Sequence, residues 1–476
     1  MDDRFALIWE KVRTGLWPLP LATTVLAALL YAALGAVDRS VGPRLLAQVP
    51  WLYSGSGDDA SSLLSTLVSG IITMSSVVFS ITIVALTLAA TQFGSRVIRL
   101  YMSDLRTKVA LGIFTMTIVY CLLALRAVDR SMTPEQVPHV VVTGGFVLGL
   151  VCVLMLLLFL HFVGRSIVAD EVIGRVSAEL EKSIAALPRL PEGEPGQAAE
   201  AAPPPGTAQR TGSGRPAQRV PSIREGYVQA IRYEDLVDLC AENDLLLQLD
   251  LRAGDFVSRH GAMATLQGAS PITPALVAAV QDAILIGEMR TPTQDLEFSI
   301  RQLVDVALRA LSPGINDANT ALVVIDRLRG ALARLLSRAL PGACWHDDVG
   351  VLRIVAKPNS YRGVIDAALN QIRQAAASHP AVVIHMLQAL AALAPYMQAR
   401  EQQEALLHHA DLVAAAGRRV SAEAHDRADI EDALRLATAA LRGSADDAID
   451  AAPVVRAPWQ RGTPETGVAA AGGSSS

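Results

Sequence analysis

Ten hydroxyl side chains lie within one long uncharged stretch of this sequence. The stretch Ser65–Phe93 (STLVSGIITMSSVVFSITIVALTLAATQF) contains no charged residue in 29 positions, yet ten of its residues are serine or threonine. Seven of them recur at steps of 4, 4, 3, 4, 7 and 4 residues: Ser65, Ser69, Thr73, Ser76, Ser80, Thr87 and Thr91. Because a helix turns once in about 3.6 residues and rises ~1.5 Å per residue, these seven form a stripe about 39 Å long on one helix face.

This stripe supports three interpretations. In the first, the small hydroxyl residues let membrane helices approach closely and hydrogen-bond to one another. In the second, several copies surround a central axis, hydroxyls replace part of an ion's hydration shell, and an apolar ring such as Val84 gates by dewetting. The hypothetical pore-lining residues are Ser69, Thr73, Ser76, Ser80, Thr87 and Thr91. In the third, the stripe lines a substrate path in a transporter, although no inverted repeat is visible.

Four apolar stretches must position the stripe, and each approaches the ~20 residues that cross ~30 Å of hydrocarbon. They are residues 17–36, 63–93, 109–125 and 140–163. Only 18% of the residues are charged, against roughly a quarter in soluble proteins. No charge lies in the core of any span apart from boundary residues such as Arg126. We therefore expect a four-span α-helical membrane region at 1–166. The missing charges argue more strongly against a proton-coupled pump or carrier than against a passive pore.

Basic residues predict how these spans are oriented. The N-terminal segment, the connection between spans two and three, and the segment after span four contain Arg4, Lys11, Arg13, Arg96, Arg99, Arg106, Lys108, Arg165, Arg175 and Lys182. The other two connections contain only Arg39, Arg44, Arg126 and Arg130. Because cytoplasmic loops carry the excess of lysine and arginine, we expect both termini in the cytoplasm.

The remaining chain predicts a cytoplasmic α+β, mainly helical, region. We expect a helical extension at 167–187, a flexible linker at 188–221, a small β-rich subdomain at 222–270, a mainly helical subdomain at 271–443 and a disordered tail at 444–476. In the β-rich part, RAGDFVSRHGAMATL (252–266) predicts a tight turn into a β-hairpin. Residues 349–355 predict one strand inside the helical part.

A second candidate site lies in the helical subdomain. The sequence SPGIND (312–317) ends one amphipathic helix, and its Asn316 or Asp317 is suited to cap the next. Our candidates for a cytoplasmic ligand or interface site are Asp305, Arg309, Asn316 and Asp317. The ligand would be an anion bound by the free backbone N–H groups at the start of the second helix. A helix cap explains the same residues with fewer assumptions.

Several functional classes find no support in the sequence. It contains no GxSxG, P-loop, HExxH or glycine-rich dinucleotide motif, so we expect no enzymatic activity and no cofactor. The net charge of −5 without a basic block argues against nucleic acid. The run CWHDD (344–348) places its side chains on adjacent residues that cannot all face one ion, so we expect no metal site. The expected partners are the lipid bilayer, inorganic ions and further copies of the chain, because three short spans cannot cover the whole stripe.

Four motifs together resemble a bacterial family of predicted membrane proteins, catalogued as domain of unknown function 2254. They are VFSITIVALTLAATQFGSRVIRLYMSD, VYCLLALRAV, GDFVSRHG and IRQLVDVALRALSPGINDANTA, and the similarity covers roughly residues 16–440. The resemblance implies a bacterial inner-membrane location, a multi-span N-terminal region and a cytoplasmic C-terminal region, and it implies no particular activity. This sequence departs from the family pattern at Ala318, where relatives often carry proline, and at Phe162, where they often carry a second histidine.

The sequence therefore predicts an integral inner-membrane protein with one of two functions. The first is an oligomeric ion-conducting pore, lined by the second span and controlled by the cytoplasmic domain. The alternative is a non-conducting, membrane-anchored sensor or scaffold whose cytoplasmic domain binds a ligand or a partner.

Overall fold

The computed structural model of the chain describes residues 18–48, 53–93, 104–166, 169–190, 217–268 and 271–443. It divides into two compact units, Met1–Gly174 and Arg175–Ser476, which are described separately below. The predicted disordered tail at 444–476 lies outside the described residues.

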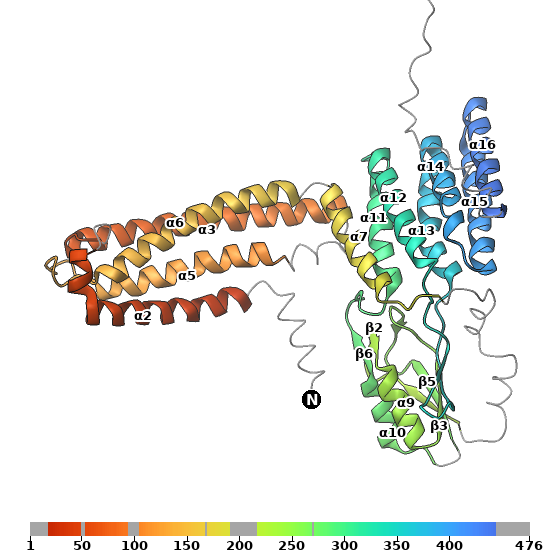
Figure 1. Ribbon diagram of the computed structural model, residues 1–476, viewed down its shortest axis with the longest axis horizontal. Helices are drawn as coiled ribbons and strands as arrows, with labels where there is room; N and C mark the ends of the chain where they lie inside the picture. Colours follow the sequence, from red (N-terminus) through yellow and green to blue (C-terminus); the bar gives the residue numbers. More distant parts are fainter. Residues whose placement is uncertain are drawn as a thin grey trace, which may run out of the picture. The chain divides into compact units, whose positions relative to one another are not determined.

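The described part of the first unit is a bundle of four long helices (Figure 1). These are α2 (Pro18–Gln48), α3 (Gly57–Phe93), α5 (Leu105–Ala127) and α6 (His139–Ser166). Each contains a segment long and apolar enough to cross a membrane: Pro18–Ser40, Gly57–Leu88, Leu105–Ala127 and His139–Gly164. The predicted four-span α-helical region is thus confirmed. Helix α3 begins earlier than expected, because Asp58 and Asp59 in its first turn favour a helix N-terminus.

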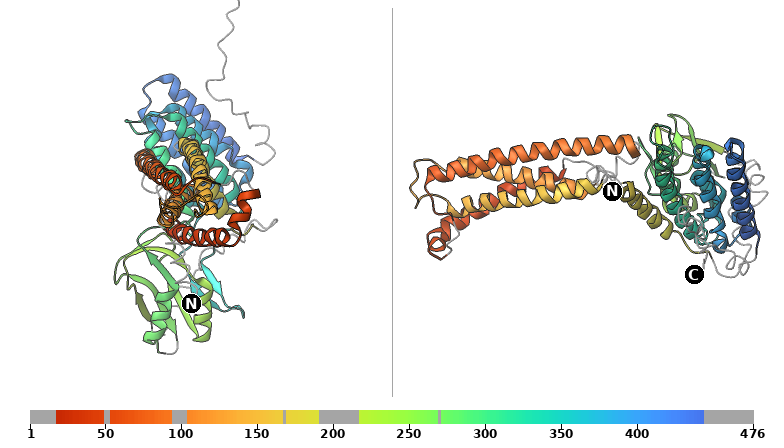
Figure 2. Two further views of the ribbon diagram at one scale, coloured as in Figure 1. Left: turned by 90° about the vertical axis from the view of Figure 1, so that its left-hand side faces the viewer. Right: turned by 90° about the horizontal axis from the view of Figure 1, so that it is seen from above.

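Helix α5 packs against each of the other three helices of this bundle, and α3 packs against both α5 and α6. Figure 2 shows these long helices running side by side. Two polar contacts join one end of the bundle: the Tyr120 hydroxyl donates to the Val141 carbonyl at 2.8 Å, and the Val141 N–H donates to the Asp38 carboxylate at 3.1 Å. They tie α2, α5 and the start of α6 together.

Two glycines of α6 lie at close helix contacts in the bundle. A Cβ added to Gly144 of α6 would lie 2.6 Å from the Tyr120 hydroxyl and 2.8 Å from a Leu34 methyl, and one on Gly145 would lie 3.0 Å from Leu64. Small residues at such contacts let helix backbones approach closely, and packing is the main attraction between helices in lipid. Glycines of α6 therefore provide close approaches within the bundle, and the interpretation of the α3 hydroxyls as a packing surface stays a prediction.

The described part of the second unit contains two β-sheets. Their strands are β1 (Ala217–Pro221), β2 (Gly226–Ile231), β3 (Leu245–Leu249), β4 (Phe256–Val257), β5 (Ala262–Gly268), β6 (Ile284–Gly287), β7 (Cys344–His346) and β8 (Leu352–Val355). One sheet has the order β1-β5-β3-β8-β7, with β3 and β8 parallel and the other neighbours antiparallel. The other is antiparallel, with the order β4-β2-β6. Together with α9 (Tyr233–Glu242) and α10 (Pro274–Ala283), these strands enclose one apolar core, and we call this part the β lobe.

The prediction of a β-hairpin at 252–266 is wrong. The expected tight Gly-Asp turn does occur, since the Asp255 N–H donates to the Arg252 carbonyl at 3.1 Å. A second turn follows β4, where the Gly261 N–H donates to the Ser258 carbonyl at 2.9 Å. However, β4 before the turn pairs with β2, whereas β5 after it pairs with β1 and β3. The turn therefore joins two sheets, a pairing that local turn residues do not reveal.

The chain segments of the β lobe also differ from those expected. The linker predicted at 188–221 ends in β1, whose five residues pair with β5, and at its start the Ala339 N–H donates to the Pro188 carbonyl at 2.9 Å. Residues 191–216 lie outside the described part of the chain. The β-rich part extends past residue 270, because β6, β7 and β8 come from the segment predicted as mainly helical.

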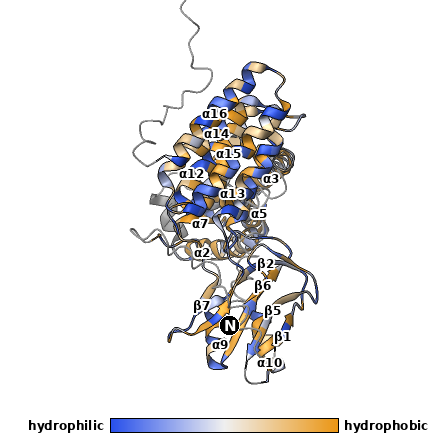
Figure 3. Cartoon of the chain, turned by 90° about the vertical axis from the view of Figure 1, so that its right-hand side faces the viewer, coloured by the Kyte–Doolittle hydropathy of each residue, from blue (hydrophilic) through white to orange (hydrophobic). Residues whose placement is uncertain are grey.

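Six further helices in the described part of the second unit form a two-layered array, which we call the helical lobe. They are α11 (Leu296–Ala310), α12 (Ala318–Leu335), α13 (Tyr361–Ala375), α14 (Pro380–Ala391), α15 (Arg400–Val420) and α16 (Ala424–Arg442). Helices α11, α13 and α15 are neighbours in one layer, and α12, α14 and α16 in the other. Figure 3 shows hydrophilic and hydrophobic residues alternating along these helices, as expected for amphipathic helices that share a core.

We predict that replacing Gly144 with leucine destabilises the four-helix bundle by about 1–3 kcal/mol, because the larger side chain must displace Tyr120 or Leu34. The matched control is Gly164→Leu on the same helix, since nothing lies within 4 Å of a Cβ at that position. Unfolding in detergent, followed by thermal melting, measures both variants. Equal stability of the two would contradict the assignment of Gly144 to a close helix contact.

Candidate functional site

The hydroxyl stripe of α3 lies on the surface of the bundle. All six hypothetical pore-lining residues are exposed: Ser69, Thr73, Ser76, Ser80, Thr87 and Thr91. The buried positions of the same helix include Leu64, Val68, Ile71, Ser75 and Val78. At ~100° per residue, the mean direction of the stripe lies about 150° from that of these buried positions. The stripe therefore points away from α5 and α6.

Most of the stripe hydroxyls are hydrogen-bonded within their own helix. The Thr73 hydroxyl donates to the Ser69 carbonyl at 3.0 Å, Ser76 to Ile72 at 3.0 Å, and Thr87 to Ile83 at 2.9 Å. These bonds satisfy each O–H group without any partner from another helix, which lowers the cost of placing them in an apolar medium. The oxygen lone pairs remain available to a donor or a cation.

Large apolar side chains flank the stripe on both sides. Ile72, Phe79 and Ile83 border one side, and Val77, Val84 and Leu88 border the other. Their exposed fractions lie between 37% and 63% within the chain. The arrangement is a narrow polar line along an otherwise apolar surface, suited to contact with lipid at its edges and with another polar or small-residue surface at its centre.

The second predicted site is a junction between helices. Asp317 caps α12: its carboxylate accepts the Thr320 N–H at 3.1 Å and the Thr320 hydroxyl at 2.5 Å. Asn316 does not cap; it adopts a left-handed backbone conformation (φ 51°), and its side-chain oxygen lies 3.1 Å from His379 Nε2. The cap explanation therefore accounts for Asp317, while Asn316 joins this turn to the start of α14.

Asp305 and Arg309 lie on α11 before this turn. Both side chains are partly buried, and both take part in polar or electrostatic interactions. The hydrogen bonds described for this region connect Asn316 and Asp317 with other residues, and none of them links these two to Asp305 or Arg309.

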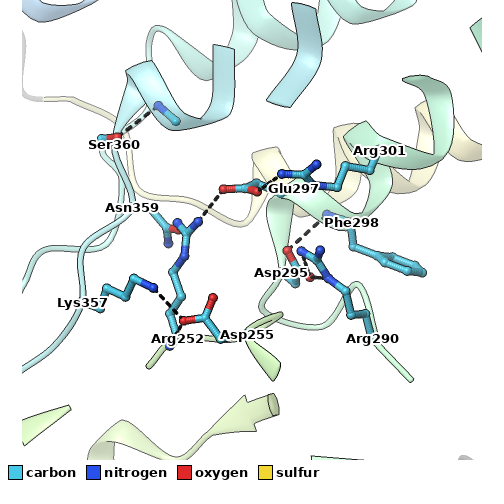
Figure 4. Close-up of polar contacts among 11 residues, drawn as sticks. Arg252, Asp255, Arg290, Asp295, Glu297, Phe298, Arg301, Lys357, Asn359 and Ser360 are labelled. Atoms are coloured by element: carbon cyan, nitrogen blue, oxygen red, sulfur yellow. Dashed lines mark hydrogen bonds and ion pairs between the residues drawn. The ribbon is translucent and has the colours of Figure 1, made fainter. Parts of the chain in front are cut away.

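A buried ionic cluster at the start of α11 was not predicted from the sequence (Figure 4). Glu297 is 8% exposed and binds two guanidinium groups, Arg252 at 2.6 Å and Arg301 at 3.0 Å. Arg252 also donates to the Asn359 side-chain oxygen. Arg252 follows β3 and Asn359 follows β8, so the cluster lies where the carboxyl ends of two parallel strands meet α11.

Asp295 forms a second ionic contact beside this cluster (Figure 4). Its carboxylate caps α11 by accepting the Phe298 N–H at 3.2 Å, and it binds Arg290 at 2.6 Å. Burial raises the pKa of Asp295, and the Arg290 charge opposes that rise. Gly254 lies against this pair at φ +90°, and an added Cβ would lie 2.4 Å from the Asp295 carboxylate. The only sequence signals were the quoted motif GDFVSRHG and two acidic residues at the start of an apolar helix.

Two histidine–carboxylate contacts connect neighbouring helices of the helical lobe. His409 of α15 is fully buried, and its Nε2 lies 2.7 Å from Asp366 of α13. His385 of α14 lies 3.0 Å from Asp326 of α12. Burial lowers the pKa of His409, and the Asp366 carboxylate opposes this effect.

Asp347 of the CWHDD run stabilises the β7–β8 hairpin. Asp347 binds Arg353 at 2.8 Å and accepts the Val351 N–H at 2.8 Å. Within the described ranges, no group of three or more histidine, cysteine, aspartate or glutamate side chains is arranged to hold a metal ion.

Four membrane-spanning helices followed by a large α+β unit define a multi-span membrane protein. The family model described as "Predicted membrane protein (DUF2254)" matches residues 13–392, and the chain belongs to this family. An uncharacterized protein of Mycobacterium tuberculosis, Rv1290c, is 29% identical over 446 residues, which is 92% of this chain and 83% of the relative. The uncharacterized protein Mb1321c of Mycobacterium bovis matches with the same identity and coverage. No solved structure matches the chain.

We predict that Glu297→Gln lowers the free energy of unfolding of the second unit by about 3 kcal/mol, because two partly buried guanidinium groups lose their shared carboxylate. Glu404→Gln, which breaks an exposed ion pair with Arg400, is the control and should cost less than about 1 kcal/mol. Chemical denaturation of the full chain in detergent measures both. A loss no larger than that of the control would contradict an ionic cluster that stabilises the fold.

We also predict that His409 makes the fold sensitive to mild acid. Its folded-state pKa lies below the ordinary value of 6.5, so the unfolded chain binds a proton first as pH falls. Stability is therefore undiminished above about pH 6.5 and decreases as pH falls from there toward the folded-state pKa. His409→Gln should flatten this part of the Tm–pH curve, whereas His425→Gln, at an 88% exposed side chain, should leave it unchanged. Identical curves for wild type and His409→Gln would contradict this role.

Proposed function

We propose that this protein is an oligomeric, passive ion-conducting pore of the bacterial inner membrane, with both termini in the cytoplasm. In this proposal α3 lines the pore, the C-terminal unit controls it, and the chain catalyses no reaction. The observation that carries the proposal is the position of the hydroxyl stripe, which is exposed and faces about 150° away from the buried face of α3.

Lipid alone gives little reason for such a stripe. A helix face in contact with acyl chains gains most from large apolar side chains, and α6 has such a face, with Leu150, Leu154, Leu157 and Leu158 each more than half exposed. The stripe of α3 instead presents small polar groups over several turns. Contact with further copies would bury it, and a closed ring of copies would turn the same hydroxyls toward a common axis.

The chemistry of the stripe favours weak, uncharged interactions with ions. Hydroxyl oxygens replace hydration water without binding an ion so tightly that it cannot leave. The segment Leu63–Phe93 contains no charged residue, so neither a fixed charge nor a proton acceptor is available within it. A passive conduit is consistent with this composition.

The alternative proposal is a non-conducting, membrane-anchored sensor or scaffold. The size of the C-terminal unit, with its own β lobe and helical lobe, favours it, because the membrane anchor alone would not need this region. In this case the stripe serves only as a contact between copies, and the C-terminal unit binds a ligand or partner.

We predict that the purified protein passes ions in planar bilayers and that Ser76→Leu blocks the current while leaving the oligomer intact. One leucine from each copy would form an apolar ring around the pore, which raises the energy barrier to a hydrated ion. Val153→Leu, at an exposed position of α6, should leave the current unchanged. If Ser76 instead packs against another copy, Ser76→Leu should dissociate the oligomer in nanodiscs, because overpacking costs about 1–3 kcal/mol. Absence of current across voltage, pH and tension ramps would contradict the pore and favour the scaffold.

A further inference from the structure

Helix α7 (Ala169–Ala185) follows the last membrane-spanning helix and crosses the boundary between the two units. Its residues from Arg175 onward belong to the second unit. In that part, Val176, Leu180 and Ile184 recur every four residues, and each is at most 1% exposed. This half of α7 is therefore fixed within the second unit by a continuous apolar face.

The segment after α7 is bound to the end of α12. The Ala339 N–H donates to the Pro188 carbonyl at 2.9 Å, and the Leu190 N–H donates to the Ser337 carbonyl at 3.2 Å. The Arg338 guanidinium also donates to the Leu187 carbonyl at 2.9 Å. We call this pair of segments, Leu187–Leu190 with Ser337–Ala339, the joint. Before the joint, Glu181 of α7 and Arg334 of α12 form an ion pair.

The joint is connected to the β lobe by a short series of polar contacts. The Tyr361 hydroxyl donates to the Arg338 carbonyl, so the first residue of α13 holds the same turn that holds α7. Two residues earlier in the chain, Asn359 accepts a hydrogen bond from Arg252, which also binds the buried Glu297. Gln402 of α15 adds a third support, because its side-chain amide donates to the Leu336 carbonyl at 3.0 Å.

We propose that the joint is the device through which the β lobe acts on α7, and so on the membrane region that α7 follows. A change at Arg252 alters the position of Asn359. Tyr361, two residues later in the chain, carries that change to Arg338 and the Leu187–Leu190 segment. Only the consequence of the coupling, control of the pore, rests on the proposed function. The coupling itself is a property of the second unit.

Hydrogen exchange of the full chain in nanodiscs tests this coupling without measuring current. Arg252→Met removes the first contact of the series, and we expect the Leu190 and Ala339 amides to exchange about tenfold faster or more. Arg435→Met is the matched control: it breaks an exposed arginine–aspartate pair of α16 and should leave both amides at the wild-type rate.

Tyr361→Phe provides a second, milder variant, because it removes one hydroxyl and no charge. It should accelerate exchange of the same two amides. In the double variant with Arg252→Met, the fold-increase in exchange rate should be smaller than the product of the two single-variant fold-increases. If Arg252→Met unfolds the second unit so that all its amides exchange, the exchange rates of Tyr361→Phe test the proposal instead. Wild-type rates at Leu190 and Ala339 in Tyr361→Phe, or in a folded Arg252→Met variant, would overturn the proposal. Absence of ion current would contradict the proposed pore but not the coupling, so failure of one proposal can be told from failure of the other.

Discussion

The packing of one face of α3 against α5 and α6 is the constraint on which the account of the membrane region depends. Leu64, Ile71 and Val78 are each at most 1% exposed on that face, so rotation of the helix would cost their burial. With this face held, the hydroxyl stripe has only one direction in which to point, away from the bundle. The glycines of α6 strengthen the constraint, because they bring α6 close to Leu64 of α3.

A comparable constraint organises the second unit. Glu297 is buried and would be unstable there without Arg252 and Arg301, and Arg252 comes from the β lobe while Glu297 belongs to the helical lobe. The cluster therefore requires both lobes to hold one arrangement. Tyr361 and Arg338 extend the arrangement to the segment that follows α7. The proposed coupling to α7 depends on this series of contacts within the second unit.

Local sequence features were sufficient for much of this fold. Apolar runs predicted four spans, the spacing of hydroxyls predicted a helical stripe, and Asp317 acts as the cap that its position suggested. The failures concern contacts between distant segments. Nothing near Phe256 indicates that it pairs with Tyr227 rather than across its own turn, and nothing near Glu297 indicates Arg252, 45 residues earlier. Likewise, the stripe was predicted from spacing, but only the packed bundle determines that it faces outward.

Disulfide cross-linking between copies tests the central claim, that the stripe of α3 faces another copy of the chain, most directly. The measurement uses Thr73→Cys in native membranes, with Cys344→Ser included because the other three cysteines are buried. Leu154→Cys, a 58% exposed position on α6, is the matched control. If the stripe faces another copy, Thr73→Cys should form a covalent dimer rapidly and Leu154→Cys should form little. Equal cross-linking of the two variants, or none from Thr73→Cys, would contradict it.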